Sequence, residues 1–314
     1  MVFYDIISVY NYKEESVLKL SEIKEGLIKN NYISTKQILY AVSGAINQQF
    51  PVLIEGDPGV GKTSLAKAVA SMLGLPLYRV QFYEGLSADK ILYDYDYQKQ
   101  LLTIESIKSS LEEHLKGKTI NEAINHVKDI DFYGENFLIE RPILKAINGK
   151  GRCVLLLDEI DKSSEEIEYT LLEMLDEFSI TIPQYGTVKC PEDMKPIVFL
   201  TSNNYREMSD ALKRRCNYLF INRKTKDEIF EILKMKAGVS EDICRGVANC
   251  MAQIQKLKLK QEPSIAEAIG WAQYIQDNFD ESNMSDLEYS ICMLAKNKDD
   301  TEVILNSGII KDNF

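Results

Sequence analysis

Apolar residues in the first part of the chain alternate between helical spacing and short continuous runs. "QILYAVSGAIN" (37–47) carries apolar residues at helical spacing, and "FPVLIEG" (50–56) is a short apolar run that predicts a buried strand. "KTSLAKAVASMLG" then predicts a helix that ends at Gly74, and "PLYRVQF" (76–82) predicts a second strand. Strands that alternate with helices predict a parallel sheet covered on both faces.

A longer and more polar stretch, about residues 84–136, interrupts this alternation. The pattern resumes with "RCVLLLDE" (152–159), which predicts a strand, and "SSEEIEYTLLEMLDEF", which predicts a helix. Ser163 and Glu166 have the spacing of a capping box, so we expect that helix to begin there.

The next segments complete the sheet and are followed by helices only. "ITIPQYGTVKC" (180–190) alternates around a glycine and predicts a hairpin, and strands are predicted at 195–203 and 216–222. After residue 222 the strand signals stop. Capping boxes are predicted for Thr225 with Glu228 and for Ser264 with Glu267.

Composition and charge narrow the range of partners. The 314 residues carry a net charge of −11 and a pI of about 4.9, which argues against constitutive binding to nucleic acid or to anionic membranes. No segment is long enough to span a bilayer, and "MVFYDIISVY" lacks the features of a signal peptide. The six cysteines form no CxxC pair, which favours reduced thiols in a cytoplasmic protein.

The segment "GDPGVGKTS", here called the P-loop, matches G-x-x-x-x-G-K-[ST] between a predicted strand and a predicted helix. Glycines let such a loop turn its N–H groups toward an anion, and the helix N-terminus adds its dipole. We expect Lys62 to meet the β- and γ-phosphates of ATP and the Thr63 hydroxyl to bind Mg²⁺. A chance glycine-rich turn is the alternative. The predicted nucleotide-binding residues are Gly56, Asp57, Pro58, Gly59, Val60, Gly61, Lys62, Thr63 and Ser64.

Two carboxylates follow the apolar run "VLLLDE". A P-loop site needs a carboxylate at the end of a neighbouring strand to hold Mg²⁺ through water, and Asp158 is placed for this role. Glu159 is the candidate to polarise the attacking water. The alternative is a strand that simply ends in surface acids.

Polar residues near the last two strands are further candidates. Asn203 ends "FLTSN", where an amide can orient water or sense the γ-phosphate, although asparagine at a strand end is usually a turn residue. Arg214 and Arg215 precede the last strand. They are either solvated surface residues or an arginine finger for a neighbouring subunit's nucleotide.

Tyr93, Tyr95 and Tyr97 alternate with aspartates inside the polar stretch. A short strand or loop that packs one aromatic face is the favoured interpretation. A substrate-facing insertion is the alternative.

The order of these motifs resembles the AAA+ ATPases: Walker A, Walker B ending in Asp-Glu, a hairpin, a strand-end Asn, then Arg-Arg and a helical lid. Within them the chain resembles the MoxR family, near its CoxD-like members, over roughly residues 35–295. The segments that carry the resemblance are "QFYEGLSADKILYDYDYQKQLL", "FLIERPILKAI", "LLLDEIDKSSEEIEYTLLEMLDEFSITIPQYGTV", "VFLTSNNYREMSDALKRRC" and "PSIAEAIGWAQ".

The resemblance implies an αβα P-loop NTPase core with a parallel sheet, followed by a small all-helical lid domain. The expected division is an N-terminal segment (1–34), a nucleotide-binding core (35–222) with an insertion at about 84–136, and the lid (223–314). By this resemblance Arg215 best matches the position of the arginine finger, and Arg214 is the alternative. The sensor-2 arginine of many AAA+ lids has no counterpart, because Ser264 is better explained as an N-cap.

The resemblance also implies a Mg²⁺-dependent ATPase that forms a homo-oligomeric, hexameric ring and remodels a client protein. CoxD-like members resemble helpers that insert cofactors into molybdenum hydroxylases or mature them, alongside a partner with a von Willebrand A domain. One alternative is a nucleic-acid motor, but the negative net charge of the chain argues against it. Another is a scaffold that binds nucleotide without hydrolysing it, against which Lys62, Asp158 and Glu159 speak.

Overall fold

The computed structural model describes residues 17–114, 131–278 and 284–314. The first ten residues, considered above for a signal peptide, lie outside these ranges, and so does part of the predicted insertion (115–130).

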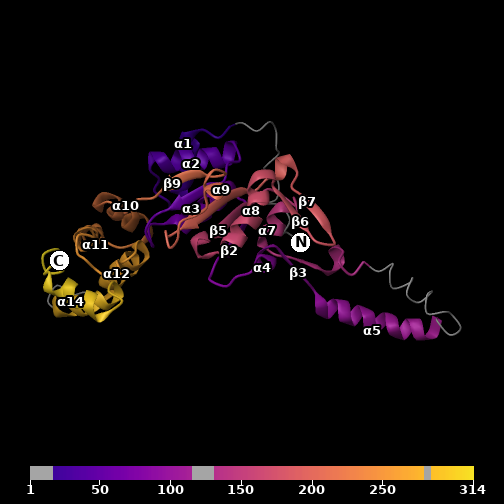
Figure 1. The fold of residues 1–314 in the computed structure, drawn as a ribbon. Coiled ribbons are helices and arrows are strands. Elements are labelled where there is room, and N and C mark those ends of the chain that lie inside the picture. The colour runs from indigo at the N-terminus through magenta and orange to yellow at the C-terminus, as the bar shows by residue number, and fades with distance from the viewer. Residues whose placement is uncertain (1–16, 115–130, 279–283) are drawn as a thin grey trace, which may run out of the picture.

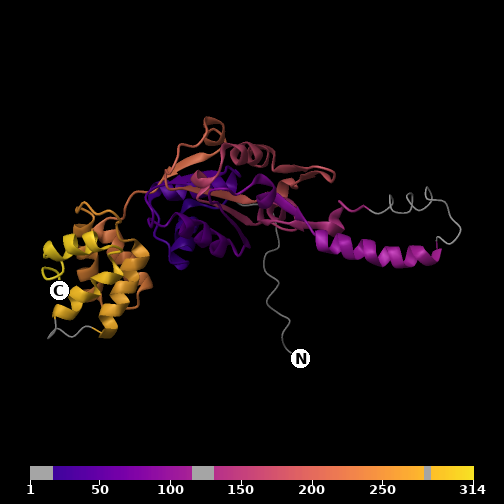
Figure 2. The same ribbon diagram turned by 60° about the horizontal axis from the view of Figure 1, so that its bottom comes forward.

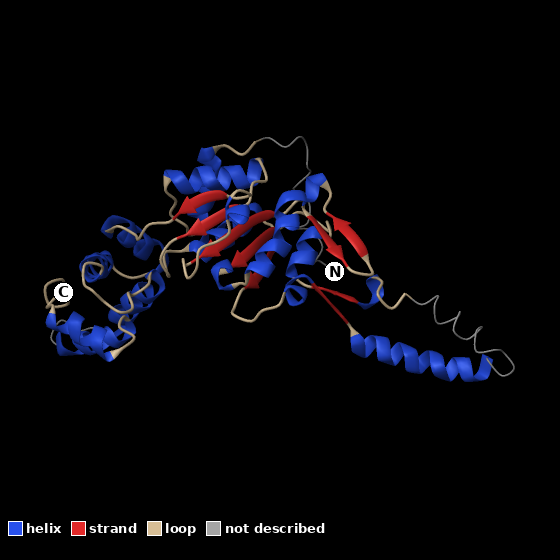
Figure 3. Cartoon of the chain, in the orientation of Figure 1, coloured by secondary structure: helices blue, strands red, loops and turns tan. Residues whose placement is uncertain are grey.

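Five parallel strands form the central sheet, as the alternating pattern predicted. They run in the order β2-β5-β8-β1-β9, and Figure 3 shows them side by side. Their bounds are β1 (Val52–Glu55), β2 (Leu77–Gln81), β5 (Val154–Asp158), β8 (Ile197–Ser202) and β9 (Asn217–Phe220). The strand order reverses beside β1, which is where open α/β sheets place their ligand crevice.

Helices cover both faces of this sheet, and the alternation along β5 shows how. Val154 and Leu156 pack into one apolar cluster, while Leu155 and Leu157 pack into the other. The first face is covered by α1 (Leu20–Lys29), α2 (Lys36–Asn47) and α3 (Lys62–Leu73); the second by α7 (Pro142–Ile147), α8 (Glu165–Glu177) and α9 (Asp210–Lys213). Every residue of β5 is buried, which explains its continuous apolar run.

The polar stretch between β2 and β5 forms a smaller unit. Its elements are α4 (Ala88–Leu92), β3 (Tyr93–Tyr95), α5 (Tyr97–His114), a 3₁₀ turn η1 (Glu135–Phe137) and β4 (Leu138–Glu140). Strands β3 and β4 pair antiparallel, and the Tyr95 ring packs edge-on against Tyr93 and Tyr133 at centroid distances of 5.8 and 5.3 Å. The packing interpretation therefore holds for Tyr93 and Tyr95, while Tyr97 is exposed. Helix α5 projects away from the sheet (Figures 1 and 2).

The predicted hairpin is present, and the predicted start of α8 is wrong by one residue. Strands β6 (Ser179–Ile182) and β7 (Gly186–Lys189) pair antiparallel. Helix α8 is capped by Ser164, whose hydroxyl accepts a hydrogen bond from Ile167 N–H. Ser163 instead closes the 3₁₀ turn η2 (Ile160–Lys162) by donating to the Ile160 carbonyl at 2.7 Å. Ser163 therefore belongs to the 3₁₀ turn η2 and is not the N-cap of α8.

The elements that the structure describes after β9 are all helices. They form α10 (Lys226–Lys236), α11 (Glu241–Ile254), α12 (Ile265–Asn278), α13 (Met284–Tyr289), the 3₁₀ turn η4 (Ser290–Met293) and α14 (Lys298–Asn306); a further 3₁₀ turn, η3 (Glu192–Met194), precedes β8. These helices share an apolar cluster around Trp271, whose Nε1 donates to the Ser290 hydroxyl at 2.7 Å. Both predicted capping boxes at the starts of α10 and α12 are formed.

The division of the chain into three parts stays a prediction, although its last boundary falls just after β9. No helix in the described ranges is long and apolar enough to cross a membrane.

Candidate functional site

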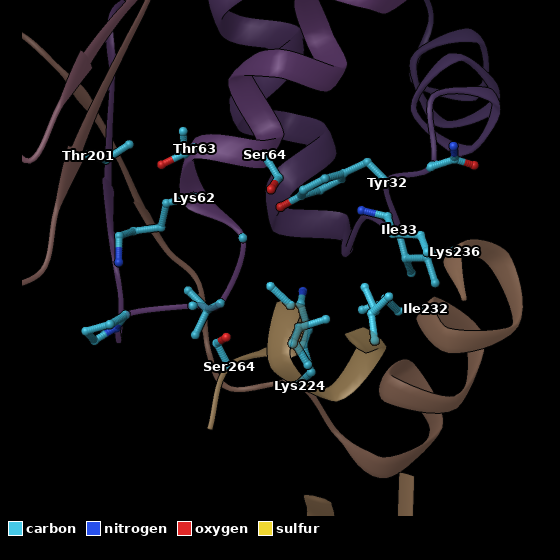
Figure 4. Close-up of a pocket in the computed structure, with 18 of the residues that line it drawn as sticks. Tyr32, Ile33, Lys62, Thr63, Ser64, Thr201, Lys224, Ile232, Lys236 and Ser264 are labelled. Carbon is cyan, nitrogen blue, oxygen red and sulfur yellow. The ribbon is translucent and has the colours of Figure 1, made fainter. Parts of the chain in front are cut away.

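The P-loop lies between β1 and α3, at the carboxyl edge of the sheet. Gly61 has a φ of 99°, a conformation that side-chain-bearing residues rarely adopt, and it directly precedes the first turn of α3. The loop borders a cavity of about 320 Å³, shown in Figure 4. Residues 58–64 line this cavity together with Asp158, Glu159 and Asn203. Gly56 and Asp57 do not line it, but their carbonyls accept hydrogen bonds from Lys62.

Lys62 is folded back onto its own loop. Its side chain is buried, and its Nζ donates to the carbonyls of Gly56 and Asp57 at 2.6 and 2.9 Å. Burial lowers the pKa of Lys62, and nearby carboxylates, first among them Asp161, oppose that shift. A cation with carbonyl partners only is available to an anionic ligand that enters the cavity.

Asp158 ends β5 and gathers hydrogen-bond donors from three other elements. Its Oδ1 accepts from the hydroxyls of Thr63 (3.0 Å) and Thr201 (2.5 Å). Its Oδ2 forms an ion pair with Arg79, whose Nη2 lies at 2.6 Å. The Asp158 side chain is only 3% exposed, so these contacts replace water around a buried charge.

Glu159 adopts an unusual backbone conformation beside Asp158. Its φ of 58° is rare for a residue with a side chain, and its N–H is held by the Thr201 hydroxyl at 2.9 Å. Its carboxylate forms an ion pair with Lys162 at 2.6 Å and is 30% exposed. The strained turn directs Glu159 away from the line of the strand and leaves it at the cavity wall.

Asn203 follows β8 and lines the cavity. The loop that carries it is fastened by Asp161, which is fully buried. The Asp161 Oδ2 accepts from the backbone N–H groups of Asn203 and Tyr205, both at 2.9 Å. This brace ties the loop after β8 to the turn after β5.

The residues predicted to hold Mg²⁺ lie together. Thr63 Oγ1 and Asp158 Oδ1 are 3.0 Å apart at the edge of the cavity, and hydroxyl and carboxylate oxygens are the ligands this cation prefers. The donor set therefore fits Mg²⁺. The Arg79 guanidinium occupies the other carboxylate oxygen in this arrangement.

The two candidate arginines lie outside this cavity. Arg215 is half-buried, donates to the Ala211 carbonyl at 2.9 Å and pairs with Asp176 of α8 at 2.6 Å. Arg214 is exposed at the end of α9. Neither side chain lines the cavity of its own chain, and the choice between them stays open.

Sequence reasoning missed several residues of this site: Tyr32, Arg79, Asp161, Thr201 and Lys224. A polar residue inside a buried apolar strand was a usable signal for Thr201, because such a residue needs a buried partner. Tyr32 and Lys224 come from segments without a motif, and only their approach to the P-loop identifies them.

A family described as "AAA domain (dynein-related subfamily)" matches residues 51–216, just over half of the chain. The match covers the P-loop, both carboxylates at the end of β5, Asn203 and the arginine pair.

Similar proteins include "Chaperone protein ClpB" of Mycoplasma pneumoniae, 25% identical over 82% of this chain and 34% of the relative. "Lon protease" of Fusobacterium nucleatum subsp. nucleatum is 25% identical over 68% of this chain and 23% of its own length. "Midasin" of Giardia intestinalis is 36% identical, over 27% of this chain and 2% of the relative. The chain thus spans at most about a third of the length of these relatives. A structure described as the Thermotoga maritima RuvB Holliday junction branch migration motor matches 91% of this chain and 68% of its own, with a TM-score of 0.42 and 16% identity.

Proposed function

Since the chain belongs to the AAA domain family, in its dynein-related subfamily, we propose that it is a Mg²⁺-dependent ATPase that remodels a client protein. The observation that carries the proposal is the meeting of Lys62, Thr63 and Asp158 around one cavity. Within this proposal the chain is MoxR-like and CoxD-like. The similarity to "Chaperone protein ClpB" over most of the chain supports the remodelling role.

The residues of the site have distinct roles in ATP hydrolysis. Lys62 leaves the two carbonyls that now hold it and binds the β- and γ-phosphates, which the loop N–H groups also contact. Thr63 would hold Mg²⁺ directly and Asp158 would hold it through water, and the bound cation would neutralise charge on the phosphates. Arg79 pairs with the other oxygen of Asp158.

Glu159 is the residue we assign to the attacking water. It polarises that water once its carboxylate leaves Lys162, an exposed pair that contributes little to stability. Asn203 lies at the same wall of the cavity and orients the water or contacts the γ-phosphate. Arg215 of a neighbouring subunit, or else Arg214, completes the site in a homo-oligomeric, hexameric ring.

The client is a protein that acquires a cofactor or matures, of the molybdenum hydroxylase type, with a von Willebrand A domain protein as a second partner. We also propose that the protein works in the cytoplasm. Its chain consists of an N-terminal segment (1–34), a nucleotide-binding core (35–222) and a helical lid (223–314). The net charge of −11 favours a protein client over the alternative of a nucleic-acid motor. A scaffold without hydrolysis is the other alternative, and the placement of Glu159 at the cavity wall speaks against it.

Two variants test the site and then the client. Lys62→Ala should abolish ATP binding in calorimetry. Glu159→Gln should bind ATP but lose roughly 10²–10⁴ in turnover, because an amide keeps the shape without the base. The ATP-loaded Glu159→Gln protein is then the bait for the client. Normal ATP affinity of Lys62→Ala would overturn the site, normal turnover of Glu159→Gln would remove Glu159 from the mechanism, and DNA-stimulated turnover would favour the nucleic-acid motor.

A further inference from the structure

Lys224 is a buried lysine on the far wall of the nucleotide cavity. It lies between β9 and α10, is 6% exposed, and lines the cavity opposite the P-loop. Figure 4 shows Lys224, Ile232 and Ser264 coming from the C-terminal segment and facing the loop that carries Lys62. A charged side chain with so little exposure needs a partner that compensates for its lost hydration.

The protein itself supplies little of that compensation. The Lys224 ammonium makes no hydrogen bond within the described ranges, and the ion pair it forms, with Glu228 Oε1, spans 3.9 Å. The other oxygen of Glu228 already accepts from the Thr225 N–H and hydroxyl in the capping box. Burial lowers the pKa of Lys224, and the charge of Glu228 opposes this shift. Three N–H donors therefore remain available on a cation that faces the cavity.

A second polar group at this end of the cavity also lacks a partner. The Tyr32 hydroxyl is enclosed, and no hydrogen-bond partner for it exists in the described part of the chain. Tyr32 and Ser264 approach the same loop: a Cβ added to Gly61 would lie 4.0 Å from the Tyr32 hydroxyl, and one added to Gly59 would lie 2.5 Å from the Ser264 Cβ. The start of α12 thus touches the P-loop, and unpartnered donors border the space beside it. Such groups in a native protein need a partner, and a bound ligand can supply it.

We propose that the Lys224 ammonium binds a phosphate oxygen of the nucleotide and so gives the C-terminal helices their charged contact with it. This inference rests on the proposed ATPase function and deepens it. It identifies a residue from the C-terminal segment that takes over the contact for which Ser264 is unsuited, because Ser264 is committed to capping α12. Nucleoside di- and triphosphates carry the anion that Lys224 lacks, and a nucleoside does not.

The first experiment compares Lys224→Met with Lys226→Met in nucleotide binding. Methionine keeps the apolar stem and removes the charge, and Lys226 is an exposed lysine in the first turn of α10. Kd values are measured for ADP and, by competition, for adenosine. Lys224→Met should weaken ADP binding by about 10- to 100-fold, the effect of one hydrogen bond to a charged group, and leave adenosine binding unchanged. Lys226→Met should stay within about twofold for both ligands, as an exposed charge should.

Equal losses for ADP and adenosine would overturn the proposal, because they would indicate a contact with the base or a structural role. An unchanged ADP affinity would overturn it as well. Lys224→Arg, which keeps the charge, should retain most of the preference for ADP over adenosine. Lys62→Ala serves as the reference: if wild-type protein binds ADP and Lys62→Ala does not, a failure of Lys224→Met refutes this inference alone.

A second experiment needs no variant and is independent of folding defects. Wild-type protein is acylated with an amine-reactive reagent, and the modified lysines are quantified by mass spectrometry. ADP should protect Lys224, adenosine should not, and Lys226 should react equally in all samples. Equal modification of Lys224 with and without ADP would refute the contact.

Discussion

Thr201→Val tests whether one buried hydroxyl organises both carboxylates of the site. Thr201 is 1% exposed in β8; its hydroxyl donates to Asp158 at 2.5 Å and accepts from the Glu159 N–H at 2.9 Å. Valine has nearly the same shape, so the change removes two hydrogen bonds and creates no large cavity.

The magnitude follows from these two contacts. A hydrogen bond to a charged group contributes about 1.5–3 kcal/mol, and a buried N–H left without a partner costs about 1–3 kcal/mol. Asp158 keeps Thr63 and Arg79 as partners, so the loss of its hydrogen bond to Thr201 should cost an amount near the lower end of the first range. We expect a loss of about 2–4 kcal/mol in the free energy of unfolding. Turnover should fall on the order of 10- to 100-fold, because the turn that places Glu159 loses its anchor.

The assay is urea denaturation followed by far-UV circular dichroism, together with steady-state ATPase kinetics. The single tryptophan, Trp271, belongs to the C-terminal cluster, so its fluorescence does not report on the sheet directly. Thr187→Val is the matched control, since the Thr187 hydroxyl makes an exposed bond to Thr181. It should change stability by less than about 0.5 kcal/mol. If Thr201→Val is equally mild and keeps its turnover number, the hydroxyl does not organise the site.

Arg215→Ala and Lys62→Ala subunits should each be inactive alone, and mixing them should restore part of the ATPase activity if Arg215 acts in trans. Arginine fingers contribute on the order of 10³–10⁵ in kcat. Full activity of Arg215→Ala alone, or no recovery in co-assembled rings, would make Arg214 the next candidate. Alkylation of native protein at pH 8 should modify Cys292, which is exposed, before four other thiols. Desolvation raises the pKa of Cys190 to about 11 and the pKa values of Cys153, Cys216 and Cys250 to about 12. Uniform labelling of all six by peptide mapping would contradict this. Burial tends to raise the pKa of Asp300, but hydrogen bonds from Lys260 and Gln261 N–H outweigh it and lower the pKa below its usual value. The stability that Asp300 contributes is therefore present above its unfolded pKa of about 3.9 and is lost as the pH falls through its folded pKa. Asp300→Asn should make the free energy of unfolding depend less on pH at acidic pH. An unchanged pH dependence would refute this contribution.

Local patterns in the sequence predicted the strands of the central sheet and the position of the P-loop. Apolar runs and helical spacing predicted all five strands of the sheet, because burial on two faces leaves a continuous apolar signature. The P-loop was equally visible, since its glycines and its lysine act within nine consecutive residues. The shift of the α8 cap from Ser163 to Ser164 shows the limit, because a 3₁₀ turn and a helix start compete for neighbouring serines.

Tertiary structure alone decided which distant residues meet. The spacing of apolar positions specifies that a strand is buried but not which strand lies beside it, so the order β2-β5-β8-β1-β9 could not be predicted from the pattern. That order brings Arg79 and Thr201 to the two oxygens of Asp158 from either side of β5. The packing of the C-terminal helices against the P-loop places Lys224 in the cavity, although no motif surrounds it in the sequence. The physical reason is that the partner of a side chain depends on how distant segments pack. The residues next to it in the sequence do not specify that packing.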